Sequence, residues 1–329
     1  MRFWVSGFRE SGTLSRRVSR ARRQRGRGGN AGLTSGLLVG GAALGLLLAL
    51  VPAAHAQTNW PKATLTLKNN RPFKAELLGR KDREWLRIRR LDNPAEIQLP
   101  DSDVVQIEFD LPLEESGGLA AYAEGKFAEA ADRMGPLLEP TLRFMNVSNN
   151  LQDEALSYLR SLYWAGRHTQ TLEACDTMLA RLDDKTPLGR ETLLYRILSL
   201  LAQGQYERVE RAFATLPAPR VDDEWAAEYW IIKATLEERA NKMAALQDTS
   251  ARLIAFRSRD LEWMPLALVF SARSYLATGE VAVARQILEE IDLVFPRAAC
   301  SNKIERLRQD LAARSEPQPP EPDVKKESP

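Results

Sequence analysis

The amino-acid sequence predicts a mainly α protein: an α-solenoid of helix pairs preceded by a small five-stranded β-barrel. Three observations predict this fold. A motif that begins with glycine recurs along most of the chain, and the residues around it follow a helical period. Period-two alternation of apolar residues is confined to about fifty residues ahead of the first copy. The 329 residues suffice for two or three domains.

Residues 1–56 have the features of a signal peptide. They contain nine arginines and one acid, Glu10, followed by an uncharged apolar run at 36–50 and by Ala54-His55-Ala56, a small-x-small site. We expect cleavage after Ala56. The alternative is an N-terminal anchor, because the uncharged stretch 28–54 could span the ~30 Å of bilayer hydrocarbon and tether the chain to a membrane. Either way, the remaining residues are expected in the periplasm or cell envelope.

Residues 57–112 are expected to form the β-barrel. Five short runs with period-two patterning are separated by turn residues, including a polar turn at 79–82, and one tight helical turn at 100–103 precedes the last run. This spacing resembles Sm-like or SH3-like barrels. A basic cluster could bind RNA, but an exported location favours a solvated strand face and no nucleic-acid partner. The cluster comprises Arg80, Lys81, Arg83, Arg87, Arg89 and Arg90.

Residues 113–314 are expected to form helix pairs, after a linker at 112–118. The recurring motif joins a turn glycine, an aromatic or aliphatic residue two positions later, and a small residue three further on. Glycine suits a turn with positive φ, and the small residue lets two helices approach closely. A degenerate turn is expected near 240–241, and a closing helix with a polar outer face at 297–314. The copies are Gly125-Lys-Phe127-x-x-Ala130, Gly166-Arg-His168-x-x-Thr171, Gly204-Gln-Tyr206-x-x-Val209 and Gly279-Glu-Val281-x-x-Ala284.

The motif resembles the tetratricopeptide repeat (TPR). Tyr275, Gly279, Ala284 and Pro296 match that repeat's pattern, although the glycine spacings of 41, 38 and 75 exceed its length of 34. The resemblance implies an exported bacterial TPR-like protein whose first helices line a protein-binding groove. It places six residues there, although Trp164 and Trp230 could instead pack neighbouring helices. The six are Arg160, Tyr163, Trp164, Leu198, Trp230 and Arg273.

Residues that could support catalysis are scarce in this sequence. It has no Gly-x-Ser-x-Gly, His-Glu-x-x-His or phosphate-loop motif, and His168 is its only histidine after residue 56. Cys175 and Cys300 are expected to be free and buried, because a linear stack of helices would hold them more than ~30 Å apart. The acids at 222–224 are expected to cap a helix N-terminus. We therefore expect no enzyme, no cofactor and no metal site.

The sequence therefore predicts a non-enzymatic scaffold that uses a TPR-like groove to bind a protein or peptide partner in the cell envelope. Residues 315–329, with five prolines and four acids, are expected to form a disordered tail. An alternative is a cell-envelope adaptor in which the β-barrel binds the ligand and the solenoid oligomerises.

Overall fold

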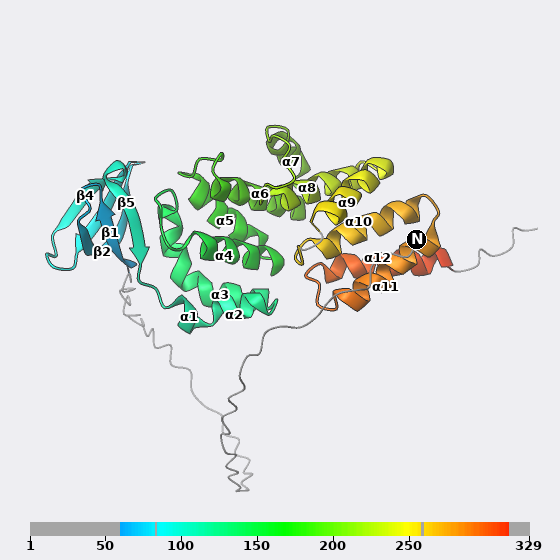
Figure 1. Cartoon of the computed structure of the whole chain (residues 1–329), viewed down its shortest axis with the longest axis horizontal. Coiled ribbons are helices and arrows are strands. Elements are labelled where there is room, and N and C mark those ends of the chain that lie inside the picture. Colours follow the sequence, from blue (N-terminus) through cyan, green and yellow to red (C-terminus); the bar gives the residue numbers. More distant parts are fainter. Residues whose placement is uncertain (1–59, 83, 258–259, 316–329) are drawn as a thin grey trace, which may run out of the picture. The chain divides into compact units, whose positions relative to one another are not determined.

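The computed structural model describes residues 60–82, 84–257 and 260–315, which belong to one compact unit (Figure 1). The predicted signal peptide or anchor and most of the predicted tail lie outside the described residues. Within them, no helix has the length and apolar character that a membrane span requires. The last strand ends at Phe109, and the first α-helix begins at Leu113.

The five predicted strands are present and form one antiparallel sheet (Figure 1). Its order is β4-β3-β2-β1-β5, so β4 and β5 occupy its two edges, and the described pairings do not close it into a barrel. The predicted helical turn before β5 is a 3₁₀ helix at Asp101–Asp103. The strands are β1 Lys62–Leu67, β2 Pro72–Lys81, β3 Trp85–Arg90, β4 Glu96–Pro100 and β5 Val104–Phe109.

Alternation along the strands buries one face of the sheet. In β3, Leu86 and Ile88 are fully buried whereas Trp85 is 40% exposed. The turn predicted at 79–82 was placed too early, because β2 continues to Lys81. Gly79, with φ 137°, lies at a register shift between β2 and β3, and the chain reverses only after Asp82, whose φ is 57°. A bulge of this kind lets a strand pass a turn-like glycine without ending.

The outer edge of β5 is covered by residues 148–150, which precede the fourth helix. The Ile107 N–H donates to Ser148 O at 2.9 Å, and the Phe109 N–H donates to Asn150 Oδ1 at 2.8 Å. Asn150 Nδ2 donates back to Phe109 O at 3.1 Å. These bonds occupy backbone N–H and C=O groups of the β5 edge that could otherwise pair with a strand of another chain. They also tie the sheet to the helical region.

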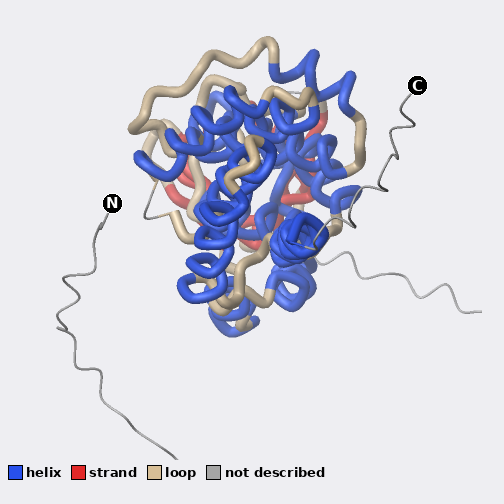
Figure 2. Tube along the Cα trace, turned by 90° about the vertical axis from the view of Figure 1, so that its right-hand side faces the viewer, coloured by secondary structure: helices blue, strands red, loops and turns tan. Residues whose placement is uncertain are grey.

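The helical region consists of consecutive helices packed side by side (Figure 2). Part of the predicted linker at 112–118 is helical, because α1 occupies Leu113–Ser116 and ends at Gly117 with φ 68°. The others are α2 Gly118–Ala123, α3 Phe127–Leu138, a 3₁₀ helix at Glu139–Phe144, α4 Gln152–Trp164, α5 His168–Leu179, α6 Pro187–Ala202, α7 Tyr206–Phe213, α8 Ala226–Arg239, α9 Met243–Phe256, α10 Met264–Ala277, α11 Val281–Val294 and α12 Ser301–Ser315.

The turns within the helix pairs confirm the role predicted for the motif glycines. Gly125, Gly166, Gly204 and Gly279 have φ between 72° and 87°, and Asn241 fills the predicted degenerate turn with φ 55°. Asparagine tolerates this conformation better than most residues because its short side chain bonds locally. The small positions of the motif are all fully buried at the helix contacts: Ala130, Thr171, Val209 and Ala284.

The last helix that the structure describes, α12, begins at Ser301, four residues later than the closing helix predicted at 297–314. Ile304, Leu307 and Leu311 are buried, whereas most residues between them are exposed. A terminal helix with one apolar and one polar face covers the last apolar surface of a helix stack and presents polar residues to solvent.

Candidate functional site

A cavity of about 560 Å³ lies among the helices, within the usual size range of binding pockets. It is lined from α4, α6, α8, α10 and α12 and by the first residues of α5 and α7. Four of the six predicted groove residues line it: Tyr163, Trp164, Leu198 and Arg273. The structure thus brings together residues that are up to 110 positions apart in sequence.

One wall of this cavity is aromatic. The Tyr163 ring lies edge-on to Trp164, with ring centres 5.0 Å apart, and 5.4 Å from the His168 ring. Burial raises the pKa of the Tyr163 hydroxyl and lowers the pKa of His168. Nδ1 of His168 is buried without a hydrogen-bond partner in the described residues. The histidine is therefore held as a neutral packing residue, as its place in the motif suggests.

A second part of the lining, here called the basic wall, carries positive charge. Four cations line the cavity, Arg239, Arg273, Lys303 and Arg306, against one carboxylate, Glu238. Arg273 pairs with Glu238 and lies 3.7 Å from Asp310 of α12. The Arg239 guanidinium stacks 3.3 Å from the centre of the Tyr206 ring.

Lys303 is the most confined of these cations. Its ammonium lies 5.1 Å from the centre of the Phe270 ring, and burial lowers its pKa. Within the described part of the chain, neither Lys303 nor Arg306 forms a salt bridge. The cavity therefore carries an excess of positive charge and suits an anionic group.

Arg160 lies outside this cavity and is not the exposed groove charge that we expected. Its Nη2 donates to Glu191 Oε2 at 3.0 Å, its Nη1 lies 3.9 Å from Glu262 Oε2, and its side chain is 29% exposed. Burial raises the pKa of Glu191, and the neighbouring Arg160 opposes that rise. Arg160 thus neutralises buried carboxylates.

Besides Glu191, the carboxylates of Glu262 and Glu228 belong to the same network of hydrogen bonds and charges around Arg160. Glu262 Oε1 accepts from Trp164 Nε1 at 2.6 Å and from the Tyr195 hydroxyl at 3.0 Å. Glu228 accepts from Trp263 Nε1 at 3.1 Å and lies 3.5 Å from the Tyr195 hydroxyl. Burial raises the pKa of Glu228 to about 8.

Sequence reasoning missed these glutamates, although a signal was present. Glu228 lies within an apolar stretch at the start of α8, Glu191 lies between Arg190 and Thr192 in α6, and Glu262 lies two residues before α10. The separations from Arg160 onward are 31, 37 and 34 residues, close to the 34 residues of a tetratricopeptide repeat although shorter than most of the glycine spacings in this chain. A charged residue that recurs at the repeat period on buried helix faces predicts a shared network, because buried charges require partners.

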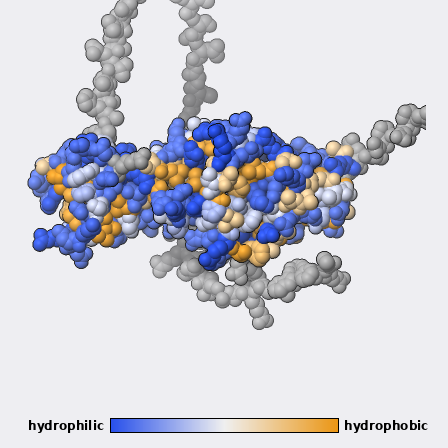
Figure 3. All heavy atoms as spheres, turned by 90° about the horizontal axis from the view of Figure 1, so that it is seen from above, coloured by the Kyte–Doolittle hydropathy of each residue, from blue (hydrophilic) through white to orange (hydrophobic). Residues whose placement is uncertain are grey.

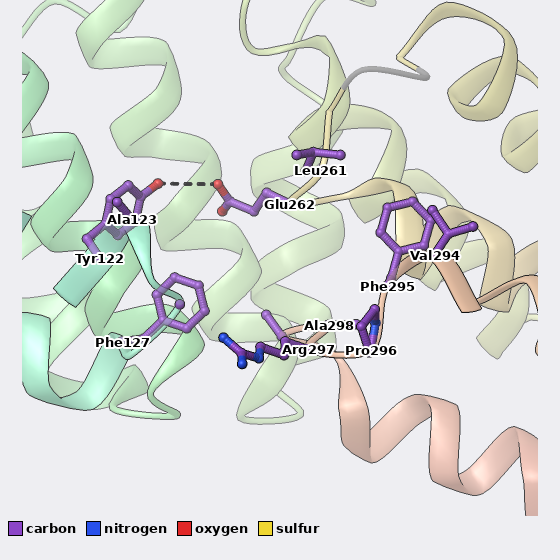
Figure 4. Close-up of a pocket in the computed structure, with 12 residues that line it drawn as sticks. Tyr122, Ala123, Phe127, Leu261, Glu262, Val294, Phe295, Pro296, Arg297 and Ala298 are labelled. Atoms are coloured by element: carbon purple, nitrogen blue, oxygen red, sulfur yellow. Dashed lines mark hydrogen bonds between the residues drawn. The ribbon is translucent and has the colours of Figure 1, made fainter. Parts of the chain in front are cut away.

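A second cleft, of about 430 Å³, lies between the start of the helical region and the segment before α12 (Figure 4). Tyr122 and Phe127 form one side, Val294 and Phe295 the other, and Arg297 lies at its lower end in this view. Across it, the Tyr122 hydroxyl is 3.5 Å from Glu262 Oε2, a contact between residues 140 positions apart.

Several apolar side chains near this cleft reach the surface. Leu261, Leu293 and Val294 are between 55% and 82% exposed. Elsewhere, apolar residues form separate patches on a largely hydrophilic surface (Figure 3).

The cysteines are free and buried, as predicted. The distance argument used for them assumed a linear stack, whereas the contact between Tyr122 and Glu262 joins the first helix pair to the start of the last. Cys300 lines the basic cavity, and burial raises its pKa to about 11.

Trp230 does not join the other predicted residues. It is half-buried, lies edge-on to Tyr229 at 5.3 Å, and has Lys233 and Arg252 against its ring. It lines a separate small pocket beside α9.

The acids predicted to cap a helix do not do so. The helix that follows them, α8, begins at Ala226 without a side-chain cap, and Asp223 instead accepts the Arg220 N–H at 2.7 Å. Among the described residues, no group of three or more His, Cys, Asp or Glu side chains is placed to hold a metal ion. No protein-family model matches the chain, and no curated protein shows significant similarity to it.

Proposed function

We propose that this chain is a non-enzymatic, TPR-like scaffold that is exported to the cell envelope and binds an extended segment of a protein partner. The observation that carries the proposal is the convergence of Tyr163, Trp164, Leu198 and Arg273 on one cavity. The left-handed turns at the motif glycines support a TPR-like solenoid. The strand order and the 3₁₀ turn before β5 support an Sm-like or SH3-like β unit.

The cavity's composition suggests the chemistry of the bound segment. Tyrosine, tryptophan and arginine are the residue types that most often anchor interfaces, and all three types line this site. Lys303 and Arg306 add positive charge that the described residues do not balance. We therefore expect the partner to present carboxylates to the basic wall and apolar side chains to Tyr163 and Trp164.

The alternative adaptor, with the ligand bound by the β unit, has less support. The β5 edge, where an added strand would pair, is already occupied by residues 148–150. The opposite edge, β4, carries Glu96 paired with Arg87 and Arg89, and such charges discourage strand addition.

Capture of envelope proteins by the purified chain tests the proposal. The variant Lys303→Glu with Arg306→Glu should lose the partner by roughly 10-fold or more, because it reverses charge at the basic wall. Arg208→Glu is the matched control, because Arg208 is exposed on α7 and lines no described pocket. Equal capture by the wild type and the cavity variant, with both folded, would contradict a groove at this site.

A further inference from the structure

The cleft in Figure 4 is lined by one carboxylate among the described residues, that of Glu262, and only one of its two oxygens is fully bonded. Oε1 accepts two short hydrogen bonds, from Trp164 Nε1 at 2.6 Å and from the Tyr195 hydroxyl at 3.0 Å. The contacts of Oε2 are long, 3.5 Å to the Tyr122 hydroxyl and 3.9 Å to Arg160 Nη1. Hydrogen bonds to a carboxylate normally measure ~2.5–2.9 Å, so Oε2 can still accept from a closer donor.

The negative charge of Glu262 is only partly balanced within the described part of the chain. The guanidinium of Arg160 binds Glu191 more closely, at 3.0 Å, so two carboxylates share one cation. The third carboxyl of the network, Glu228, keeps its proton at neutral pH because burial raises its pKa to about 8. The Glu262 side chain is 18% exposed, against 7% for Glu191. The surplus negative charge is therefore accessible at Glu262.

Aromatic and apolar side chains form most of the remaining wall of the cleft (Figure 4). Tyr122 and Phe127 lie edge to face on one side, with ring centres 5.9 Å apart, and Phe295 lies on the other side. Aromatic rings attract a cation, and apolar surface suits the carbon chain that carries it. The volume of about 430 Å³ is within the usual range of ligand pockets.

Arg297 is the one cation that lines the cleft within the described residues, at its lower end in Figure 4. Its side chain is exposed, and it lies near a carboxylate outside the cleft, because Lys126, and more weakly Arg297, lowers the pKa of Glu124. Water and Glu124 therefore screen the charge of Arg297. Glu262, in the wall of the cleft, is screened less and acts more strongly on a bound charge.

We propose that this cleft binds a primary ammonium carried on an apolar chain, as in a lysine side chain or a free alkylamine. The ammonium donates to Glu262 Oε2 and to the Tyr122 hydroxyl oxygen, and its third N–H remains for water. The carbon chain lies between Phe127 and Phe295. The site differs from the basic cavity, although Ala299 lines both, and it does not depend on a protein partner in that cavity.

The indole N–H of Trp164 reports on this site, because it donates to the same carboxylate. In NMR spectra of the purified full-length chain, n-pentylammonium should shift this resonance with a saturable curve. The neutral analogue n-pentanol should not, and the spectrum of Trp164→Phe identifies the resonance. A second arm uses a blocked glycyl-lysyl-glycine peptide. Tighter binding of the peptide than of n-pentylammonium assigns the site to a lysine of a polypeptide, and weaker binding assigns it to a free amine.

Variants test the charge that the cleft recognises. Glu262→Gln should weaken n-pentylammonium binding by about fivefold or more, because the amide still accepts from Trp164 but lacks the charge. Val294→Lys, at an exposed position of the cleft, should weaken it by about threefold through repulsion. Leu293→Lys is the matched control, because Leu293 is the adjacent exposed residue of α11 and does not line the cleft. Arg297→Gln should tighten binding by about twofold, because it removes a repelling charge.

The proposal is overturned if n-pentylammonium and the lysine peptide both leave the Trp164 resonance in place, or if n-pentanol shifts it equally. It is also overturned if Val294→Lys and Leu293→Lys bind n-pentylammonium equally well, or if Arg297→Gln weakens binding, as it would for an anionic ligand. Circular dichroism checks the folding of each variant. If Glu262→Gln does not fold, Val294→Lys and its control still decide the question, because both changes lie at exposed side chains.

Discussion

Replacing Glu228 with glutamine should remove a pH dependence of stability that this residue imposes. The Glu228 carboxyl is 3% exposed, accepts from Trp263 Nε1 and lies close to Arg160, Glu191 and Glu262. One guanidinium therefore faces three carboxyls. Burial, with Glu191 and Glu262 adding to it, raises the pKa of Glu228 to about 8 and outweighs the opposing charge of Arg160.

The sign follows from proton binding. The unfolded chain releases this proton near its ordinary value of 4.5, whereas the folded chain retains it up to about 8. Stability that is fully present below pH 4.5 is therefore lost as the pH rises through 8. At 1.36 kcal/mol per pH unit, the gap corresponds to a loss of about 4 to 5 kcal/mol. Glutamine resembles the protonated carboxyl and does not titrate.

Urea unfolding at pH 5, 7 and 9 measures the effect. Wild type and Glu228→Gln should differ by less than ~1.5 kcal/mol at pH 5, and the variant should be the more stable by several kcal/mol at pH 9. Glu207→Gln, an exposed acid on α7, serves as the control and should follow the wild type. Parallel pH profiles for wild type and Glu228→Gln would refute the assignment of a retained proton.

Four further predictions follow from individual residues. Gly204→Ala should lower the free energy of unfolding by ~1–2 kcal/mol, because φ is 72° at this position. Asn241→Gly, at the corresponding turn of a later helix pair, should not lower it. A thermal unfolding midpoint that Gly204→Ala leaves unchanged would contradict the left-handed turn at Gly204. Trp164→Phe should cost ~1.5–3 kcal/mol in urea unfolding, because the ring remains while its 2.6 Å bond to the Glu262 carboxylate is lost. Cys300, with its pKa raised to about 11, should react slowly with iodoacetamide at pH 8 until the chain unfolds, and a Cys175–Cys300 disulfide in a non-reducing mass map would contradict this. The protein from the envelope fraction should begin at Gln57, and intact mass spectra that retain residues 31–56 would favour the anchor.

Local chemistry made the elements predictable. Period-two alternation located all five strands, and the motif glycines located four helix–helix turns, because φ and side-chain direction depend mainly on near neighbours. The resemblance to the tetratricopeptide repeat, rather than local periodicity, suggested that Tyr163, Trp164, Leu198 and Arg273 share a surface, and the four residues line one cavity.

Long-range contacts could not be read from the chain. Nothing near Ser148 or Asn150 in sequence indicates that they complete the edge of β5, and nothing near Glu262 indicates that it meets Tyr122, Trp164 and Tyr195. The structure gives Arg160 a different role from the one predicted, again because of a long-range contact. A guanidinium on a helix can face solvent or a buried carboxylate, and only the packing of α4 against α6 placed Glu191 beside it.

The repeat pattern, the strand pattern and the composition of the segments outside the described residues were thus available from residue type and spacing. The tertiary structure decided which charged residues share a cavity, which are buried with one another and which ends of the helical region meet. The physical reason is that repeat spacing constrains how each helix packs on the next. How helices far apart in the chain are oriented to one another depends on the detailed fit of every interface between them.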